Sequence, residues 1–341
     1  MKIYCLDQVL AGAAVPADPQ YRKALALGLA LRLFGVAAHA SQCAQQLARI
    51  LPALACGQYE FYFDPVGRLV GGVTWALVND KVHRAMVKHG GTGLAQSDWT
   101  GGQQPWIVDF TARDGALGTI MAHLRDQRLS KYDTCTYVTQ KGRRRLVKQV
   151  GRSDRSSFML RPQRARFGGA PWVAGREDFV HALERRFFKA HLHGQCFLAL
   201  HHCDRYMHLS VASLYRVVKE IVALRQVRIY LSAQGAPAGM LTWAWLSERT
   251  FERVGEQPLH GIHPSEWNEG SALCLFDVAV SRAVRPAMEA DIFGALFPEH
   301  AGIVLYRPPC TKSRAAALAI SRQQRRIIGK WIDTHPSNAS I

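Results

Sequence analysis

The stretch Ser97–Phe110, SDWTGGQQPWIVDF, places two Trp and two adjacent Gly residues ahead of an apolar run that contains a single acid, Asp109. A carboxylate among apolar neighbours is costly to bury unless another group pairs with it. A second stretch, Ser265–Val278, reads SEWNEGSALCLFDV and carries its own lone acid, Asp277. In both stretches this Asp follows the first Trp by the same interval. The likeness of the two stretches predicts a repeated folding unit.

The repeat holds in register over a much longer part of the chain. The interval from His39 to Asp109 is only one position longer than the interval from His208 to Asp277. A Thr-Trp-Ala triplet occurs at 74–76 and again at 242–244, and its distance from the preceding His also differs by one position. A period of about 165 residues is too long for a solenoid repeat, so we expect a tandem duplication of a whole domain.

The duplication divides the 341 residues into two predicted domains joined by a linker. Residues 151–172 are rich in Arg, Ser, Gly and Pro and lack hydrophobic periodicity, which is typical of a linker. The first domain is expected over residues 1–150. The second domain, which includes a basic C-terminal segment, is expected over residues 173–341.

Apolar periodicity predicts the same order of elements in both domains, and therefore an α/β fold. Each domain begins with helices, continues with a β-hairpin and the strand that carries the lone Asp, and ends with a helix and another strand. The first hairpin has a type I turn at Asp64–Gly67. Neither a helix nor a strand is predicted for residues 81–100, which are Gly-rich and polar in places. Helices are expected over residues 20–35, 117–124, 179–189 and 288–297, and strands over residues 60–63, 69–78, 105–111, 135–139, 227–231, 240–246 and 303–306.

Two basic segments carry almost all of the net charge of +17. Residues 141–166 contain ten Lys or Arg and one acid, and residues 307–330 contain seven Lys or Arg and no acid. Such segments indicate an acidic partner, which would be a nucleic acid, an anionic membrane or an acidic protein, unless they are merely solvated charge. The chain has no recognised nucleic-acid motif, so nucleic acid is not the expected partner.

The remaining composition indicates a globular protein of the cytoplasm. A membrane-spanning helix needs about 20 consecutive apolar residues, and no apolar run is that long, so no transmembrane segment is expected. Eight Cys are scattered without a CxxC pair, which favours reduced thiols in a reducing compartment. His and Cys residues crowd the stretch 191–203, but their spacing fits no known closed zinc site, and no metal is expected.

A His with a carboxylate partner is a suitable general base, because the acid fixes its tautomer and raises its pKa. His39 and Asp109 form such a candidate pair, and His208 and Asp277 form the second. The alternative is structural, with the His capping a helix and the Asp paired with an Arg. The spacing leaves both interpretations open.

Several short motifs of the first domain occur in a combination that resembles a known family. These motifs are Leu27-Gly28, His39, Leu51-Pro52, Gln58-Tyr59, Trp75-Ala76, Asp98-Trp99-Thr100-Gly101-Gly102 and Trp106-Ile107-Val108-Asp109-Phe110. Together they resemble the toxin-activating lysine acyltransferases, which are cytoplasmic activators of RTX toxins. The likeness covers about residues 20–150 and extends more faintly over 185–310.

The resemblance implies a fold similar to GNAT acyltransferases, with a mixed, twisted sheet flanked by helices. It implies transfer of a fatty acyl chain from acyl carrier protein to an internal Lys of a protoxin, without a bound cofactor. His39 and Asp109 fall on the catalytic positions of the family, as do His208 and Asp277 in the second copy. The alternative is a catalytically inert module that binds acyl carrier protein or toxin.

Aromatic residues and the backbone beside them complete the expected site. Trp75, Trp99 and Trp106 are expected to contribute to substrate binding, although Trp is more often a core residue. The backbone near Trp75 is expected to polarise the thioester carbonyl.

Departures from the family pattern make the first copy the better-kept one. Val36 and Arg205 stand where the family has a Ser three residues before each His. In the second copy, Glu269 replaces Gly101 and Cys274 replaces Trp106.

Overall fold

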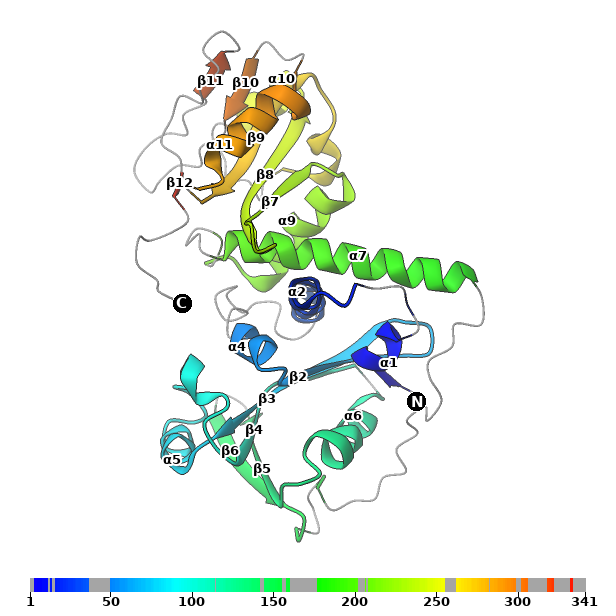
Figure 1. Ribbon diagram of the computed structural model, residues 1–341, viewed down its shortest axis with the longest axis vertical. Coiled ribbons are helices and arrows are strands. Elements are labelled where there is room, and N and C mark those ends of the chain that lie inside the picture. Colours follow the sequence, from blue (N-terminus) through cyan, green and yellow to red (C-terminus); the bar gives the residue numbers. More distant parts are fainter. Residues whose placement is uncertain are drawn as a thin grey trace. The chain divides into compact units, whose positions relative to one another are not determined.

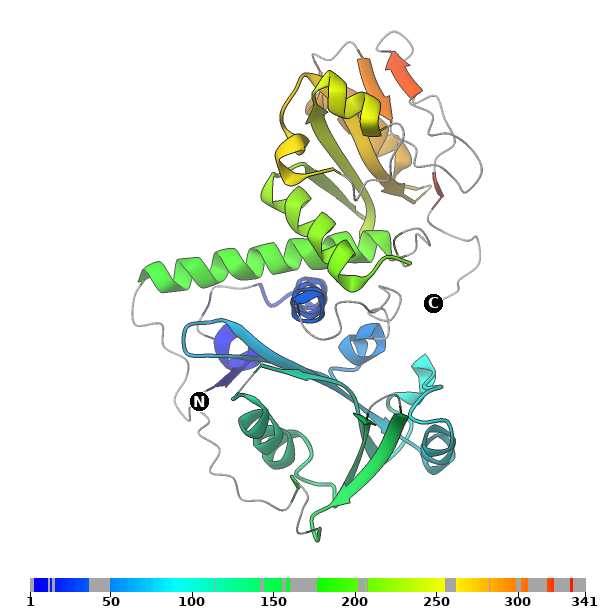
Figure 2. The same ribbon diagram turned by 180° about the vertical axis from the view of Figure 1, so that it is seen from behind.

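The structure is a computed structural model, and it divides the chain into two compact units, which Figures 1 and 2 show from opposite sides. The first unit contains the described residues up to His191, and the second contains those from Leu192 onward. None of the helices in these residues combines the length and apolar character needed to cross a membrane. The structure describes residues 3–11, 13, 16–36, 50–113, 115–141, 144–154, 158–159, 177–201, 206, 208–254, 262–281, 283–298, 302–305, 318–321 and 332–333.

The first unit is built on a mixed sheet whose strands lie in chain order. All neighbouring strands run antiparallel except β4 and β5, which are parallel and are joined by a helical crossover. The strands are β1 (Tyr4–Cys5), β2 (Tyr59–Phe63), β3 (Leu69–Val78), β4 (Gln104–Ala112), β5 (Thr134–Lys141) and β6 (Arg144–Gly151).

Helices cover both faces of this sheet (Figure 1). On one face lie α2 (Pro19–Val36) and α4 (Ile50–Ala55), and both contact β3. On the other face lies α6 (Leu117–His123), whose Ile120 packs into an apolar cluster with Val73 and Trp75. The remaining helices of the unit are α1 (Leu6–Leu10), α5 (Asp80–Lys88), the 3-10 turn η1 (Gln96–Asp98) and the π-helix η2 (Leu124–Arg128).

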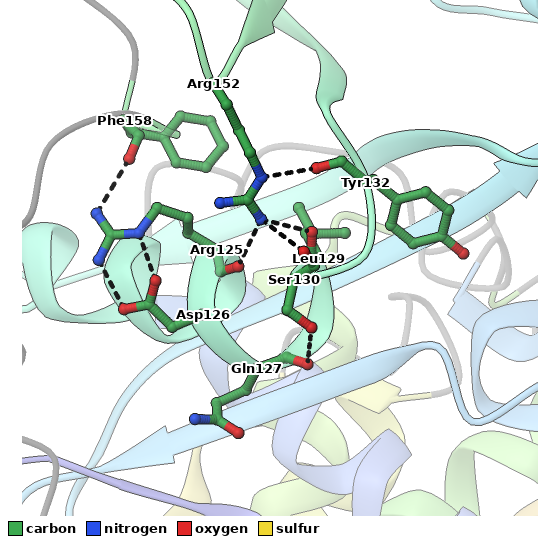
Figure 3. A network of polar contacts seen from close by, with 8 residues as sticks. All are labelled: Arg125, Asp126, Gln127, Leu129, Ser130, Tyr132, Arg152 and Phe158. Carbon is green, nitrogen blue, oxygen red and sulfur yellow. Dashed lines mark hydrogen bonds and ion pairs between the residues drawn. The ribbon is translucent and has the colours of Figure 1, made fainter.

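An Arg from the first basic segment binds carbonyl oxygens in and just after the π-helix η2, as Figure 3 shows. The Arg152 guanidinium donates to the carbonyl oxygens of Arg125, Leu129, Ser130 and Tyr132 at 2.9–3.4 Å. Carbonyls at a helix end lack intrahelical partners, so the guanidinium stabilises this turn. Arg152 therefore has a structural role.

Helix α2 packs closely against the part of α7 (Glu177–Leu200) that belongs to the first unit. A Cβ added at Gly28 would lie 1.6 Å from the carbonyl oxygen of Ala190, so only Gly permits this approach. The Tyr21 ring stacks on His191 with centroids 4.0 Å apart, which adds a second contact between the two helices.

The second unit repeats the order of five strands of the first, with β7 to β11 in the places of β2 to β6. Its strands follow the order β11-β10-β9-β8-β7, β12 pairs with β9, and β9 and β10 form a parallel pair. The π-helix η5 (Ile292–Leu296) directly follows α11 (Arg285–Asp291), just as η2 directly follows α6 in the first unit. The other elements are α9 (Val211–Ala223), α10 (Glu248–Val254), the 3-10 turn η4 (Pro264–Trp267), β7 (Val227–Leu231), β8 (Pro237–Leu246), β9 (Ala272–Val280), β10 (Gly302–Leu305), β11 (Leu318–Ser321) and β12 (Ile332–Asp333).

The structure confirms the predicted α/β class, with helices flanking mixed sheets. The first hairpin turns where the sequence predicted, because Gly67 N donates to Asp64 O and the Asp64 side chain accepts from two further amides. Helix α5 was missed: Asn79 caps it by accepting from Val82 N. Strand β6 was also missed, within the first basic segment. Most of the predicted linker lies outside the described residues.

Candidate functional site

Asp109 lies at a β-bulge between strands β3 and β4. Thr74 is opposite Asp109, but the next residue, Trp75, is opposite Ile107. Strand β4 therefore contains one extra residue, Val108, at this point. A bulge of this kind bends the strand and changes the direction of the side chains that follow.

The bulge decides which face of the sheet receives the acid. Ile107 and Phe110 both pack against the apolar cluster beneath α6, although a regular strand would send residues three apart to opposite faces. Asp109 is thereby directed to the other face, where it meets Thr74. The cost expected from burying a lone acid in an apolar run is avoided, because the acid leaves the α6 cluster and remains partly exposed.

The Asp109 carboxylate is held by the side chain opposite it. Thr74 Oγ1 donates to Asp109 Oδ2 at 3.1 Å, and the Asp109 backbone N–H donates to the same Oγ1 at 3.1 Å. Thr74 is only 3% exposed. A hydrogen bond to an ionised carboxylate is stronger than one between neutral groups, so this pair fixes the direction of the acid.

The second unit contains the same irregularity. Trp243 is opposite Leu275 and Leu241 is opposite Val278, so β9 advances three residues while β8 advances two. Thr242, which lies inside this interval, is fully buried. The backbone of Asp277 belongs to β9, and its side chain lies outside the described part of the structure.

Of the two candidate His residues, the structure describes His208 and not His39. His39 lies outside the described residues, in the segment that joins α2 to α4. Both of these helices contact β3, the strand that carries Thr74. His208 is described and exposed, two residues before Ser210, whose side chain caps α9. A contact between either His and its Asp stays a prediction.

The three candidate Trp residues lie in the interior of the first unit. Trp75, Trp99 and Trp106 are 8%, 2% and 1% exposed. Trp106 Nε1 also donates to His83 Nδ1 at 3.0 Å, which satisfies the indole in its buried position. Each side chain therefore has a core role, and the predicted role in substrate binding stays a prediction.

The amide of Trp75 does not fit the expectation that it polarises a thioester carbonyl. Trp75 N–H donates to Gln58 O at 3.0 Å, so this donor is already engaged. In the second unit, Trp243 N–H donates to Gln226 O in the same way.

The Gln58 and Gln226 side chains are buried, and their Oε1 atoms have no hydrogen-bond partner among the described residues.

The two adjacent Gly residues of the opening stretch have different roles. A Cβ at Gly102 would lie 2.2 Å from Val78 O, and a Cβ at Gly270 would lie 2.0 Å from Leu246 O. A Cβ at Gly101 would meet nothing closer than 3.6 Å. The second copy accordingly keeps the crowded Gly and has Glu269 at the roomy position.

A separate polar cluster lies on the α6 side of the first sheet. The Tyr62 hydroxyl and His123 Nδ1 are 3.0 Å apart, and Glu60 is paired with Arg128. Burial, and to a lesser extent the Arg128 cation, lowers the pKa of His123 to about 4. Burial raises the pKa of the Glu60 carboxyl, and Arg128 opposes that rise. The cluster lies on the opposite face of the sheet from Asp109, so we assign it to the fold and not to the Asp109 site.

Comparison with known proteins gives a family match that follows the two copies. The RTX toxin acyltransferase family matches residues 20–151 and residues 185–320, which together make up more than half of the chain. The chain belongs to the RTX toxin acyltransferase family. The two matched segments agree with the tandem duplication that the repeated Trp-to-Asp spacing predicted.

A curated relative supports membership of the RTX toxin acyltransferase family. The chain is similar to the lysine-acyltransferase RtxC of Vibrio cholerae serotype O1, with 33% identity over 82 residues. The match covers 24% of this chain and 53% of RtxC, so the chain spans about half the length of the relative it matches.

The sequence did not predict Thr74 as a residue of the site. The repeated Thr-Trp-Ala triplet was the available signal, because the same Thr recurs at residue 242. The bulge gives no such signal, because it depends on the pairing of two strands.

Proposed function

We propose that this chain is a protein-lysine fatty acyltransferase that transfers an acyl chain from acyl carrier protein to an internal Lys of an RTX-like protoxin. The observation that carries the proposal is the carboxylate of Asp109, held by Thr74 at a bulge inside a segment that matches the family. The acyl donor is already an activated thioester, so the reaction needs no bound cofactor.

The main chemical obstacle is the protonation of the Lys amine. With a pKa of about 10.4, only about 0.04% of the amine is neutral at pH 7, a handicap of roughly 4.6 kcal/mol. In the proposed mechanism, His39 first takes one proton from the Lys ammonium, and the neutral nitrogen then attacks the thioester carbonyl carbon while losing a second proton, which passes to the leaving sulfur. The carbon–sulfur bond then breaks, an amide forms, and the leaving thiolate takes up a proton.

Asp109 assists His39 in this mechanism without bonding to the substrate. A carboxylate beside an imidazole fixes its tautomer and stabilises the imidazolium that forms when the amine proton is taken. Thr74 and the bulge hold Asp109 on the face that α2 and α4 cover. The segment that carries His39 joins these two helices in sequence, which supports pairing of His39 with Asp109.

Acyl carrier protein is proposed as the donor because the exposed edge of the first sheet is basic. Arg145 and Lys148 lie exposed on β6, the edge strand. Acyl carrier protein is strongly acidic, so these cations would raise its encounter rate in a salt-dependent way. A GNAT-like arrangement of the sheet and helices is part of the same proposal.

The test offers one protoxin two donors that carry the same labelled acyl chain, acyl carrier protein and coenzyme A. The proposal predicts label on protoxin Lys, a bond that resists hydroxylamine as an amide does, and faster transfer from the carrier protein. Label lost on hydroxylamine treatment would contradict transfer to Lys. Tight binding of the carrier protein without any transfer would instead establish an inert binding module.

A further inference from the structure

We propose that Thr74 is a positioning residue for the proposed acyl transfer, because its hydroxyl fixes the direction of the Asp109 carboxylate. The inference rests on the proposed function of Asp109 and adds a residue to it. Thr74 touches neither the acyl donor nor the Lys in this account, and it acts only through the acid.

The geometry of the hydroxyl determines where its single proton goes. Thr74 Oγ1 accepts from the backbone N–H of Asp109, so a lone pair of the hydroxyl is committed to that bond. The proton is then directed to Asp109 Oδ2, 3.1 Å away. The hydroxyl thus links the backbone and the carboxylate of one residue, which restricts rotation of the Asp109 side chain.

Thr suits this position better than Ser or Val. Its side chain is almost fully buried, and a β-branched residue has few χ1 conformations available. The methyl group therefore packs against the sheet while the hydroxyl stays aimed at the acid. Val would keep the shape and lose the hydrogen bond, whereas Ser would keep the hydrogen bond and lose only the methyl group.

Among the described residues, the second unit repeats both the buried Thr and the bulge. Thr242 is fully buried at the interval where β9 carries its extra residue, opposite the segment that includes Asp277. Gly101 and Trp106 were replaced in the second copy while this Thr remained. Retention of the Thr together with the bulge indicates that they work as one unit.

Thr111 supplies a matched control on the same strand as Asp109. It lies opposite Gly72 in the same pair of strands, two residues beyond Asp109. Its Oγ1 is buried and has no hydrogen-bond partner among the described residues. Thr111→Val therefore makes the same chemical change as Thr74→Val near the acid, but removes no bond that the structure describes.

The experiment measures single-turnover acyl transfer and the thermal midpoint for wild type and four variants. These are Thr74→Val, Thr74→Ser, Thr111→Val and Asp109→Asn. We expect Thr74→Val to lower the maximal rate on the order of tenfold to a hundredfold with little change in the donor concentration giving half-maximal rate. Thr74→Ser should recover most of the rate, and Thr111→Val should match wild type.

A combined variant distinguishes positioning from a general loss of structure. Adding Thr74→Val to Asp109→Asn should lower the rate no further, because the two residues act as one unit. Full activity of a folded Thr74→Val chain, with Asp109→Asn inactive, would overturn the positioning role alone. An equal loss in folded Thr74→Ser and Thr74→Val would also overturn it. Full activity of Asp109→Asn would overturn the proposed function and this inference together.

Discussion

At the scale of single residues, a Tyr at equivalent positions of the two units has a different hydrogen-bond partner in each. Tyr62 lies beside His123 in the first unit, and Tyr230 donates to Asp291 at the equivalent place in the second. His123 is buried and kept neutral, whereas Asp291 also binds Arg228 as an ion pair. The first unit therefore contains a buried titratable group that the second has replaced.

The His123 imidazole is expected to make the first unit sensitive to acid. Its pKa falls from 6.5 to about 4 on folding, so between these pH values the imidazole is protonated in the unfolded chain and neutral in the folded chain. Stability from this group is present above pH 6.5 and is lost as the pH falls toward 4, by about 3 kcal/mol in all.

The measurement is urea unfolding of wild type and His123→Gln at several pH values between 7 and 4. His191 has a similarly lowered pKa, so both chains should lose stability in acid, and only the difference between them reports on His123. The difference should shrink as the pH falls. Parallel stability curves would contradict the buried, neutral His.

At the scale of elements, the sequence predicted what local chemistry determines. The turn at Asp64–Gly67 was predicted because Asp, Pro and Gly each favour one position of a type I turn. The face on which Asp109 lies was not predictable, because strict alternation places it with Ile107. The extra residue at Val108 is a property of two paired strands, and single-strand periodicity cannot reveal it.

The close approach of α2 and α7 predicts that Gly28→Ala lowers the stability of the protein, although Ala usually stabilises a helix. Ala is a better helix former than Gly by about 1 kcal/mol, so Gly28→Ala would stabilise a freely exposed helix. Here the new Cβ would meet the backbone of Ala190, and overpacking of this kind costs about 1–3 kcal/mol. Thermal unfolding should therefore show a lowered midpoint for Gly28→Ala. Gly294→Ala is the control, because a Cβ there meets nothing within 4 Å, and its midpoint should not fall.

The adjacent Gly pair gives a second prediction at this scale. Gly101→Ala should fold with nearly unchanged stability, because the nearest atom to its Cβ is 3.6 Å away. Gly102→Ala should be destabilised by about 1–3 kcal/mol, because its Cβ would overlap the backbone of Val78. Chemical denaturation of the two variants side by side measures the difference. Equal midpoints would show that the turn is not packed against the end of β3.

At the scale of the whole molecule, the chain is a tandem pair of RTX toxin acyltransferase segments. Both copies keep the Thr, the bulge and the crowded Gly, so the backbone arrangement does not separate an active copy from an inactive one. The side chains around it do differ, since the first copy keeps Trp106 and the second has Cys274. The sequence predicted the duplication because the spacing of a few residues survives changes elsewhere.

The proposed mechanism places acyl transfer at the first copy, with His39 as the base. Its most direct test is the rate of transfer of a labelled acyl chain to protoxin Lys by His39→Ala and His208→Ala, each compared with wild type. Loss of a general base costs about 10²–10⁴ in rate, so His39→Ala should lose at least a hundredfold while His208→Ala stays close to wild type. Full activity of a folded His39→Ala chain would contradict the role of His39 as the base.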